Sequence, residues 1–194
     1  NGEEIMNMVT HIAGGGIGLI IAVLCCIKAA TYNTAICLVG CIIFAVAITG
    51  LYAMSSVYHG LRTNTSKKVM QVLDHCTIYF LIAGTYTPIL LSAFVPAYPW
   101  IGWGLFVAEW ALAALAGTLT AIDLKKYTVF SMICYIGMGW CIVIAMKPLI
   151  AVLPLAGVLL LVIGGVIYTL GTILYGLGKK HRYMHSLFHF FVLA

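Results

Sequence analysis

The chain has 194 residues, of which 63% are hydrophobic and only 8% are charged, with a net charge of +5. In an average soluble domain roughly a quarter of the residues are charged, and a chain this short cannot bury so much apolar surface in a core. The composition therefore excludes a soluble protein. It predicts an all-α polytopic integral membrane protein with a single transmembrane domain over residues 1–194.

Charged residues divide the sequence into apolar stretches long enough to cross a bilayer, which takes about 20 residues of helix. Asp, Glu, Lys and Arg are absent between Lys28 and Arg62, between Lys126 and Lys147, and between Lys147 and Lys179. Backbone groups in lipid need internal partners, and the stretches lack the alternation of a β-barrel, so we expect helices. The seven expected spans are residues 8–28, 36–60, 69–93, 99–120, 126–146, 151–177 and 183–194.

Two of these spans depend on local features. The uncharged stretch between Asp74 and Glu109 contains Pro96 and Pro99, so we divide it between two helices. The seventh stretch has only 12 residues before Ala194, so it is either a short half-span or a span that lacks its natural C-terminal part, and we favour truncation. The absence of an initiator methionine suggests that residues are missing at the N-terminus as well.

The basic residues predict the orientation in the membrane. Lys28 and Lys147 lie in odd-numbered loops, and the other eight of the ten Lys and Arg lie in even-numbered loops. The positive-inside rule therefore places the N-terminus in the cytoplasm, and we expect the bacterial inner membrane. The net positive charge is then a topology signal and a possible contact for anionic lipids, and nucleic-acid binding is not expected. The eight are Arg62, Lys67, Lys68, Lys125, Lys126, Lys179, Lys180 and Arg182.

The cysteines are interpreted as small buried hydrophobic residues. All seven lie in apolar stretches and none forms a C-x-x-C pair. Cys37 and Cys41 are one helical turn apart, but they lie at the end of the second span away from the histidines. We do not expect them to bind a metal. The full set is Cys25, Cys26, Cys37, Cys41, Cys76, Cys134 and Cys141.

All six histidines lie on one side of the predicted membrane. This is the cytoplasmic side, where Glu4 and Asp74 join them. Ionisable groups within a membrane are costly, and their presence suggests a functional site. A single buried histidine can be a packing residue, but six at one membrane depth favour a site. The histidines are His11, His59, His75, His181, His185 and His189.

The spacing of two histidines in the last span predicts metal binding. His185 and His189 are four residues apart, so their rings share one face of a helix. Three His ligands with an open fourth position are typical of catalytic zinc sites, although iron, nickel and copper also accept imidazole. Ser55 and His59 repeat the same spacing in the second span. Asp74 could then hold or deprotonate a bound water, and Ser55 could donate to that water or to a carbonyl under attack.

Other polar residues are assigned weaker roles. Glu4, Asn7 and His11 share one stripe of the first helix and either orient the metal ligands or form an acidic helix start. His75 points about 100° away from Asp74 and is expected to pack or form hydrogen bonds rather than bind metal. Glu109 lies in the middle of the fourth span, and its role stays open. His181 lies in a basic segment, at the expected membrane interface.

Four motifs together resemble the hemolysin III family, which is related to the progestin and adipoQ receptors and the alkaline ceramidases. The motifs are residues 4–11 (EIMNMVTH), 55–59 (SSVYH), 73–75 (LDH) and 185–189 (HSLFH). They occur in the family's order and spacing along the whole chain. The resemblance implies a seven-helix bundle in which His59, His185 and His189 hold zinc, with Asp74 and Ser55 near the bound water.

Three functions are compatible with this pattern. The first is a zinc-dependent hydrolase acting on a lipid amide or ester, which the open three-histidine set favours. The second is a membrane sensor or regulator in which the zinc is structural. The third is a pore-forming cytolysin, which would require oligomerisation or a second polar stripe. Membrane lipid is the expected partner in each case, and the sequence does not indicate an oligomer.

Overall fold

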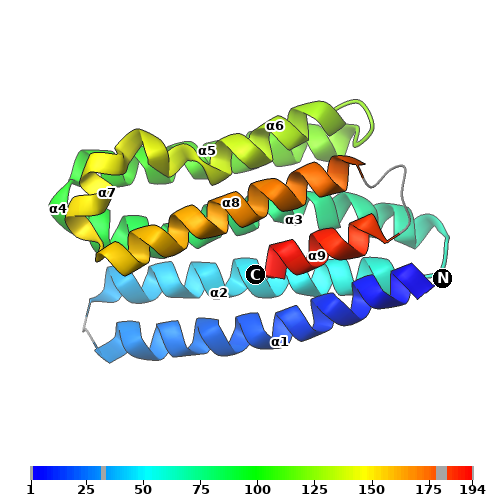
Figure 1. The fold of residues 1–194 in the computed structure, drawn as a ribbon, viewed down its shortest axis with the longest axis horizontal. Coiled ribbons are helices and arrows are strands. Elements are labelled where there is room, and N and C mark those ends of the chain that lie inside the picture. The colour runs from blue at the N-terminus through cyan, green and yellow to red at the C-terminus, as the bar shows by residue number, and fades with distance from the viewer. Residues whose placement is uncertain (1, 32–33, 178–182, 194) are drawn as a thin grey trace.

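The computed structural model describes residues 2–31, 34–177 and 183–193, and every element in these ranges is helical. Six helical stretches are long and apolar enough to cross a membrane, and they lie along one bundle axis (Figure 1). The prediction of an all-α membrane bundle is confirmed. The stretches are α1 (Gly2–Thr31), α2 (Ala35–Gly60), α3 (Thr65–Ile89) with η1 (Leu90–Phe94) and α4 (Val95–Ala97), α5 (Pro99–Ile122), α6 (Thr128–Gly139) with η2 (Cys141–Ala145) and α7 (Met146–Val152), and α8 (Leu155–Leu177).

The expected seventh span is a short helix. Helix α9 (Met184–Leu193) has 10 residues, or about 15 Å of length, which is about half of the hydrocarbon thickness. It begins at the end of the bundle that holds the N-terminus and ends partway along it (Figure 1). The prediction of seven spanning helices is therefore corrected to six among the described residues. Ten residues can nevertheless carry polar side chains from the bundle end into its interior.

Two spans change their helical geometry along their length. The third span passes from α3 into a π-helical turn and ends at Ala97, after which Pro99 begins α5, so the predicted break between Pro96 and Pro99 is confirmed. The fifth span tightens into the 3₁₀ segment η2 after Gly139 and then continues as α7 to Val152, beyond the expected end at 146. Pro148 lies in the first turn of α7, where a missing N–H disrupts no helical hydrogen bond.

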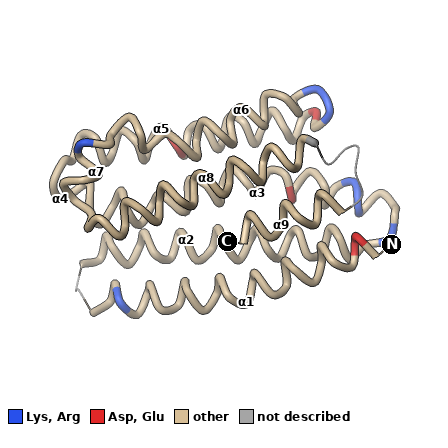
Figure 2. Tube along the Cα trace, in the orientation of Figure 1, with Lys and Arg blue, Asp and Glu red and all other residues tan. Residues whose placement is uncertain are grey.

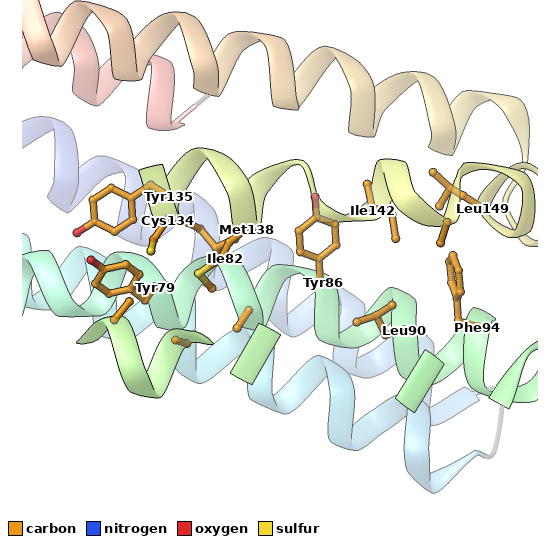
Figure 3. Packing of buried hydrophobic residues seen from close by; sticks show 14 of the residues in the cluster. Tyr79, Ile82, Tyr86, Leu90, Phe94, Cys134, Tyr135, Met138, Ile142 and Leu149 are labelled. Carbon is orange, nitrogen blue, oxygen red and sulfur yellow. The ribbon is translucent and has the colours of Figure 1, made fainter. Parts of the chain in front are cut away.

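The hydrophobic core lies between α3 with η1, α5, α6 with η2 and α7, and α8. Figure 3 shows two facing rows in this core. Tyr79, Ile82, Tyr86, Leu90 and Phe94 form one row, and Cys134, Tyr135, Met138, Ile142 and Leu149 form the other. Outward-facing positions on the spans are also apolar. They include Ile20, Val46 and Ile144, which are 62%, 69% and 87% exposed, as expected for helices that face lipid.

The described Lys and Arg residues gather at the two ends of the bundle (Figure 2), whereas the buried carboxylates Asp74 and Glu109 lie within it. Lys28 and Lys147 lie at one end. Glu3, Glu4, Lys67 and Lys68 lie at the other, together with the loop that contains Asp123, Lys125 and Lys126. We call this second end, which also holds the N-terminus and the start of α9, the histidine end. His181, Lys179, Lys180 and Arg182 lie outside the described residues.

Candidate metal centre

Three histidines meet at the histidine end of the bundle. His59 is in the last turn of α2, and His185 and His189 are on successive turns of α9. One ligand nitrogen from each ring lies within 4.8 Å of the others. His59 and His189 are buried, and His185 is half-buried. The structure therefore brings together the three residues that the sequence predicts as metal ligands.

The orientation of the His59 ring is set by a carboxylate on another helix. Its Nδ1 lies 2.9 Å from Oε2 of Glu4, and the same oxygen lies 3.0 Å from Nζ of Lys67. The carboxylate can only accept, so Nδ1 carries the proton and Nε2 keeps its lone pair. That Nε2 is buried and has no hydrogen-bond partner among the described residues. An unpaired basic nitrogen in this position is suited to bind a metal ion.

The tautomer of His189 follows from a similar contact. Its Nδ1 lies 3.3 Å from Oγ1 of Thr10, and that hydroxyl donates its own proton to the Asn7 carbonyl at 2.9 Å. The hydroxyl must therefore accept from His189, which places the proton on Nδ1 and leaves Nε2 as the lone-pair nitrogen. Helix α1 thus fixes the rings of two histidines that lie far from it in the sequence.

Asn7 also ties α9 to α1. The Ser186 hydroxyl donates to the Asn7 side-chain oxygen at 2.5 Å, and both residues are buried. Because Ser186 follows His185 directly in the chain, this bond fixes the start of α9 against the first helix. Asn7 of the first-helix stripe therefore contacts the helix that carries two of the candidate ligands.

His11 stacks on a candidate ligand. Its ring lies 3.7 Å from the ring of His189, at an angle of 18°, and makes an edge contact with Tyr52 at 5.2 Å. Both ring nitrogens of His11 are buried and without a hydrogen-bond partner among the described residues. His11 therefore packs beside the cluster and does not belong to the close set of three ligand nitrogens.

Ser55 and Asp74 line a cavity together with two of the three candidate ligands, His185 and His189. The cavity has a volume of about 70 Å³ and reaches His11, His185 and His189. This is enough for an ion with water, since one water needs at least ~10–15 Å³. Ser55 is 1% exposed and Asp74 is 8% exposed. Ser55 and Asp74 are close enough for the hydroxyl and the carboxylate to influence one another. An acid and a hydroxyl are thus present beside the candidate ligands.

Two other predicted residues lie outside the ligand set. The Nδ1 of His75 donates to the Gln71 carbonyl at 2.8 Å, and its Nε2 lies 3.3 Å from the Tyr175 hydroxyl. Both nitrogens are therefore used, in agreement with the expectation that His75 forms hydrogen bonds. Glu109 is on α5, away from the cluster, where it is 4% exposed and its Oε2 has no hydrogen-bond partner among the described residues.

Sequence reasoning missed Lys67 and Tyr175 as neighbours of the site. Lys67 could have been found, because only a short loop separates it from His59 and brings the start of α3 beside the end of α2. Tyr175 stands in an apolar stretch and carries no such signal. Its ring lies 5.3 Å from the ring of His185.

The fold and the histidine cluster define a class of protein, namely a helical integral membrane protein with a buried polar centre that can accept a metal. The comparisons then identify the family. The family model described as haemolysin-III related matches residues 1–194, and the chain belongs to this family. The relationship to the progestin and adipoQ receptors is represented by a human relative with lower sequence identity, the monocyte to macrophage differentiation factor.

Three relatives illustrate the range of similarity. A hemolysin-3 homolog from Bacillus subtilis (strain 168) is 39% identical over 99% of this chain and 88% of its own length. A hemolysin-3 from Bacillus cereus is 35% identical over 99% of this chain and 86% of its own length. The human monocyte to macrophage differentiation factor is 26% identical over 77% of this chain and 63% of its own length. No solved structure matches the chain.

Proposed function

We propose that the chain is a zinc-dependent membrane hydrolase that cleaves a lipid amide or ester. The observation that carries the proposal is the His59, His185 and His189 set, whose ligand nitrogens lie within 4.8 Å of one another beside a cavity. Three neutral imidazoles leave a fourth position open, as in catalytic zinc sites. Zinc suits imidazole ligands and, when bound, polarises water or a carbonyl group.

Asp74 is the proposed general base. It lines the cavity together with Ser55, His185 and His189. Asp74 would take a proton from the water that attacks the substrate carbonyl and would give it to the leaving amine or alcohol. The products are then a carboxylic acid and an amine or alcohol. Ser55 would orient the carboxylate during both transfers.

The lining of the cavity supports a lipid substrate. Beyond the polar residues, the cavity wall is mostly apolar and extends along α3, α6 and α8. An acyl chain fits such a wall, because apolar surface gains free energy when it leaves water. Tyrosines are also part of the lining and can contact a polar headgroup, since tyrosine combines an apolar ring with a hydroxyl. The residues that contribute are Ile78, Leu81, Ile82, Met132, Tyr135, Tyr168, Phe188 and Val192.

The proposal places the centre at the cytoplasmic side of the bacterial inner membrane. The histidine end holds most of the described basic residues, so the positive-inside rule directs it to the cytoplasm. The same residues can contact anionic lipid headgroups. Membrane lipid is therefore the proposed partner as well as the source of substrate, and nucleic acid has no role in it.

A second candidate is a regulator in which the metal is structural. The ligands join α2 to α9, and α9 has only 10 residues. An ion at this point would hold a short helix in place, and its loss would change the packing of α9 against α1. This candidate requires metal binding without turnover, whereas the hydrolase requires both.

The experiment that separates the two uses purified protein loaded with zinc in mixed lipid–detergent micelles. It measures release of fatty acid from N-acyl sphingoid bases, N-acyl ethanolamines and lysolipid esters by mass spectrometry. The hydrolase predicts turnover that Asp74→Asn abolishes while zinc stays bound. Glu109→Gln is the matched control, because it changes another buried carboxyl away from the cavity. Absence of turnover with any of these substrates, at full zinc occupancy, would favour the structural role.

A further inference from the structure

A carboxyl group lies buried near the middle of a spanning helix, apart from the metal centre. Glu109 stands midway along α5 (Figure 2) and is 4% exposed. It shares the buried face of this helix with Ala113 and Ala116, which belong to the hydrophobic core. Its Oε2 is buried and has no hydrogen-bond partner within the described part of the chain. An unpaired polar atom is costly at this depth, so the carboxyl group is suited to bind a ligand.

Hydrogen bonds of the neighbouring residues show which parts of the bundle lie level with Glu109. Nε1 of Trp110, the next residue on α5, donates to Oγ1 of Thr87 on α3 at 3.0 Å. The hydroxyl of Tyr86, which precedes Thr87, donates to the Gly139 carbonyl at the end of α6. Helix α5 packs against both spans. The carboxyl group therefore lies at one depth with these parts of α3 and α6.

Both neighbouring spans leave α-helical geometry close to this depth. In the third span, Pro88 has no N–H to donate, and the π-helical turn η1 begins at Leu90. In the fifth span, the N–H of Val143 bonds to the Trp140 carbonyl at 3.1 Å, which is the i, i+3 pattern of the 3₁₀ segment η2. Departures of this kind inside a helix frequently mark functional sites and hinges.

The spans packed against α5 offer Glu109 no counter-ion. The segments 83–97 and 128–146 contain no Lys, Arg, His, Asp or Glu. Lys147, the next charged residue of the fifth span, lies at the end of the bundle (Figure 2). Tyr86 and Cys141 are the titratable side chains of these spans nearest to this level. An ionised carboxylate here would be an uncompensated charge within the membrane, which is unfavourable.

The ligand that fits one unpaired oxygen is a proton. Hard metal cations such as Mg²⁺ take about six oxygen ligands. The polar oxygens level with Glu109 are already used, because the Gly139 carbonyl accepts from Tyr86 and the Thr87 hydroxyl accepts from Trp110. A proton needs a single oxygen atom and removes the negative charge of the carboxylate. The surroundings therefore favour proton binding over metal binding.

We propose that Glu109 is an exchangeable proton-binding site in the membrane interior, placed where the third and fifth spans leave α-helical geometry. Uptake of one proton converts the carboxylate, with a charge of −1, into a neutral carboxylic acid, and no electron is transferred. Hydrogen bonds in a 3₁₀ segment are poorer than those in an α-helix, so η2 is the place where the bundle opens to exchange the proton. The site is separate from the proposed hydrolase, because it uses other residues.

The test is infrared spectroscopy of the full chain in lipid bilayers, before and after transfer to D₂O. It follows the C=O stretch of protonated carboxylic acids. The expected result is an acid band that shifts within minutes in D₂O and that is missing from Glu109→Gln. Asp74→Asn is the matched control, because it removes another buried carboxyl group, and it should keep the band. His185→Ala/His189→Ala should keep the band as well.

Two infrared results would overturn the proposal. A band that stays unshifted in D₂O for hours would show a sealed acid that serves packing alone. Identical spectra of the wild type and Glu109→Gln would show that Glu109 holds no proton.

A second readout uses the unmodified protein, so it does not depend on whether a variant folds. Dicyclohexylcarbodiimide is an apolar reagent that modifies protonated carboxyl groups in membranes, and peptide mass spectrometry locates the product. It should modify Glu109, whereas a water-soluble carbodiimide should modify the exposed Asp123 and spare Glu109. Sodium and potassium ions should leave the rate at Glu109 unchanged. Protection by either ion would identify a metal cation as the ligand and overturn the proton site, as would absence of modification.

Discussion

Nδ1 of His59 and Oε2 of Glu4 are 2.9 Å apart, although the two residues are separated by 55 positions in the chain. The contact joins the last turn of α2 to the first turns of α1. It aims the other nitrogen of His59 at His185 and His189, and that nitrogen is buried and unpaired within the described structure. Lys67 holds the carboxylate from a third helix at 3.0 Å. The proposed ligand geometry therefore depends on a residue that does not itself reach the metal.

Glu4→Gln should weaken zinc binding without unfolding the protein. The amide keeps the size of the side chain but loses the charge that orients His59 and pairs with Lys67. Loss of such a supporting partner typically lowers metal affinity by about 10- to 100-fold, which competition with a zinc chelator would measure. Glu3→Gln, one residue earlier in the same turn, is the control and should keep wild-type affinity. An unchanged affinity in Glu4→Gln would show that the contact is not needed to position His59.

Removal of His59 and removal of His75 should have different effects on the metal. His59→Ala deletes a proposed ligand and should lose the bound zinc. His75→Ala deletes hydrogen bonds to Gln71 and Tyr175, so it should retain zinc. Elemental analysis of the two purified variants measures this difference. Equal loss of zinc in both variants would mean that His75 belongs to the metal centre and is not only a hydrogen-bonding residue.

Gly84→Ala should destabilise the bundle because α2 and α3 touch at this position. A Cβ on Gly84 would lie 2.5 Å from the Cβ of Ala47, which has no flexible side chain to move away. The expected loss in the free energy of unfolding is about 1–3 kcal/mol, the usual range for overpacking. It should exceed the ~1 kcal/mol that alanine gains over glycine in a helix. Thermal unfolding in detergent measures the change.

Gly104→Ala provides the control for this prediction. No atom lies within 4 Å of the position that its Cβ would take, so this variant should be as stable as the wild type or more so. If both variants unfolded at the same temperature as the wild type, the close approach of α2 and α3 would not hold in the membrane protein.

The proposed orientation predicts where a reporter fusion is active. A reporter inserted beside Lys125, in the loop between α5 and α6, should report the cytoplasm, and one inserted beside Pro154 should report the opposite side. Alkaline phosphatase and green fluorescent protein fusions give opposite signals in the two compartments. An external signal at Lys125 would reverse the orientation and move the histidine end to the outside.

The spans and the break before α5 could be predicted from the sequence because they depend on local properties. Hydropathy and charge set where a helix can lie in lipid, and Pro96 and Pro99 mark the turn. Within the described part of the chain six helices are long enough to span, not the seven expected, because hydropathy identifies the last apolar run but its helix has only 10 residues. The 3₁₀ segment after Gly139 was also missed, since no proline or charge precedes it.

The polar centre was predicted in outline because topology brings alternate helix ends together. The i, i+4 spacing of His185 and His189 is visible in the sequence, but the partners of each ring are not. The contacts of Glu4 with His59 and of Thr10 with His189 depend on how far α9 enters the bundle and on how α1 is rotated.

The measurement that tests the central claim most directly is the metal content of the purified protein, wild type beside His185→Ala/His189→Ala. Both proteins are offered zinc during purification, and elemental analysis gives zinc per chain. The account predicts about one zinc in the wild type at the three-histidine centre and none there in the double variant. Equal zinc in both proteins, or none in the wild type, would contradict a metal centre formed by these histidines.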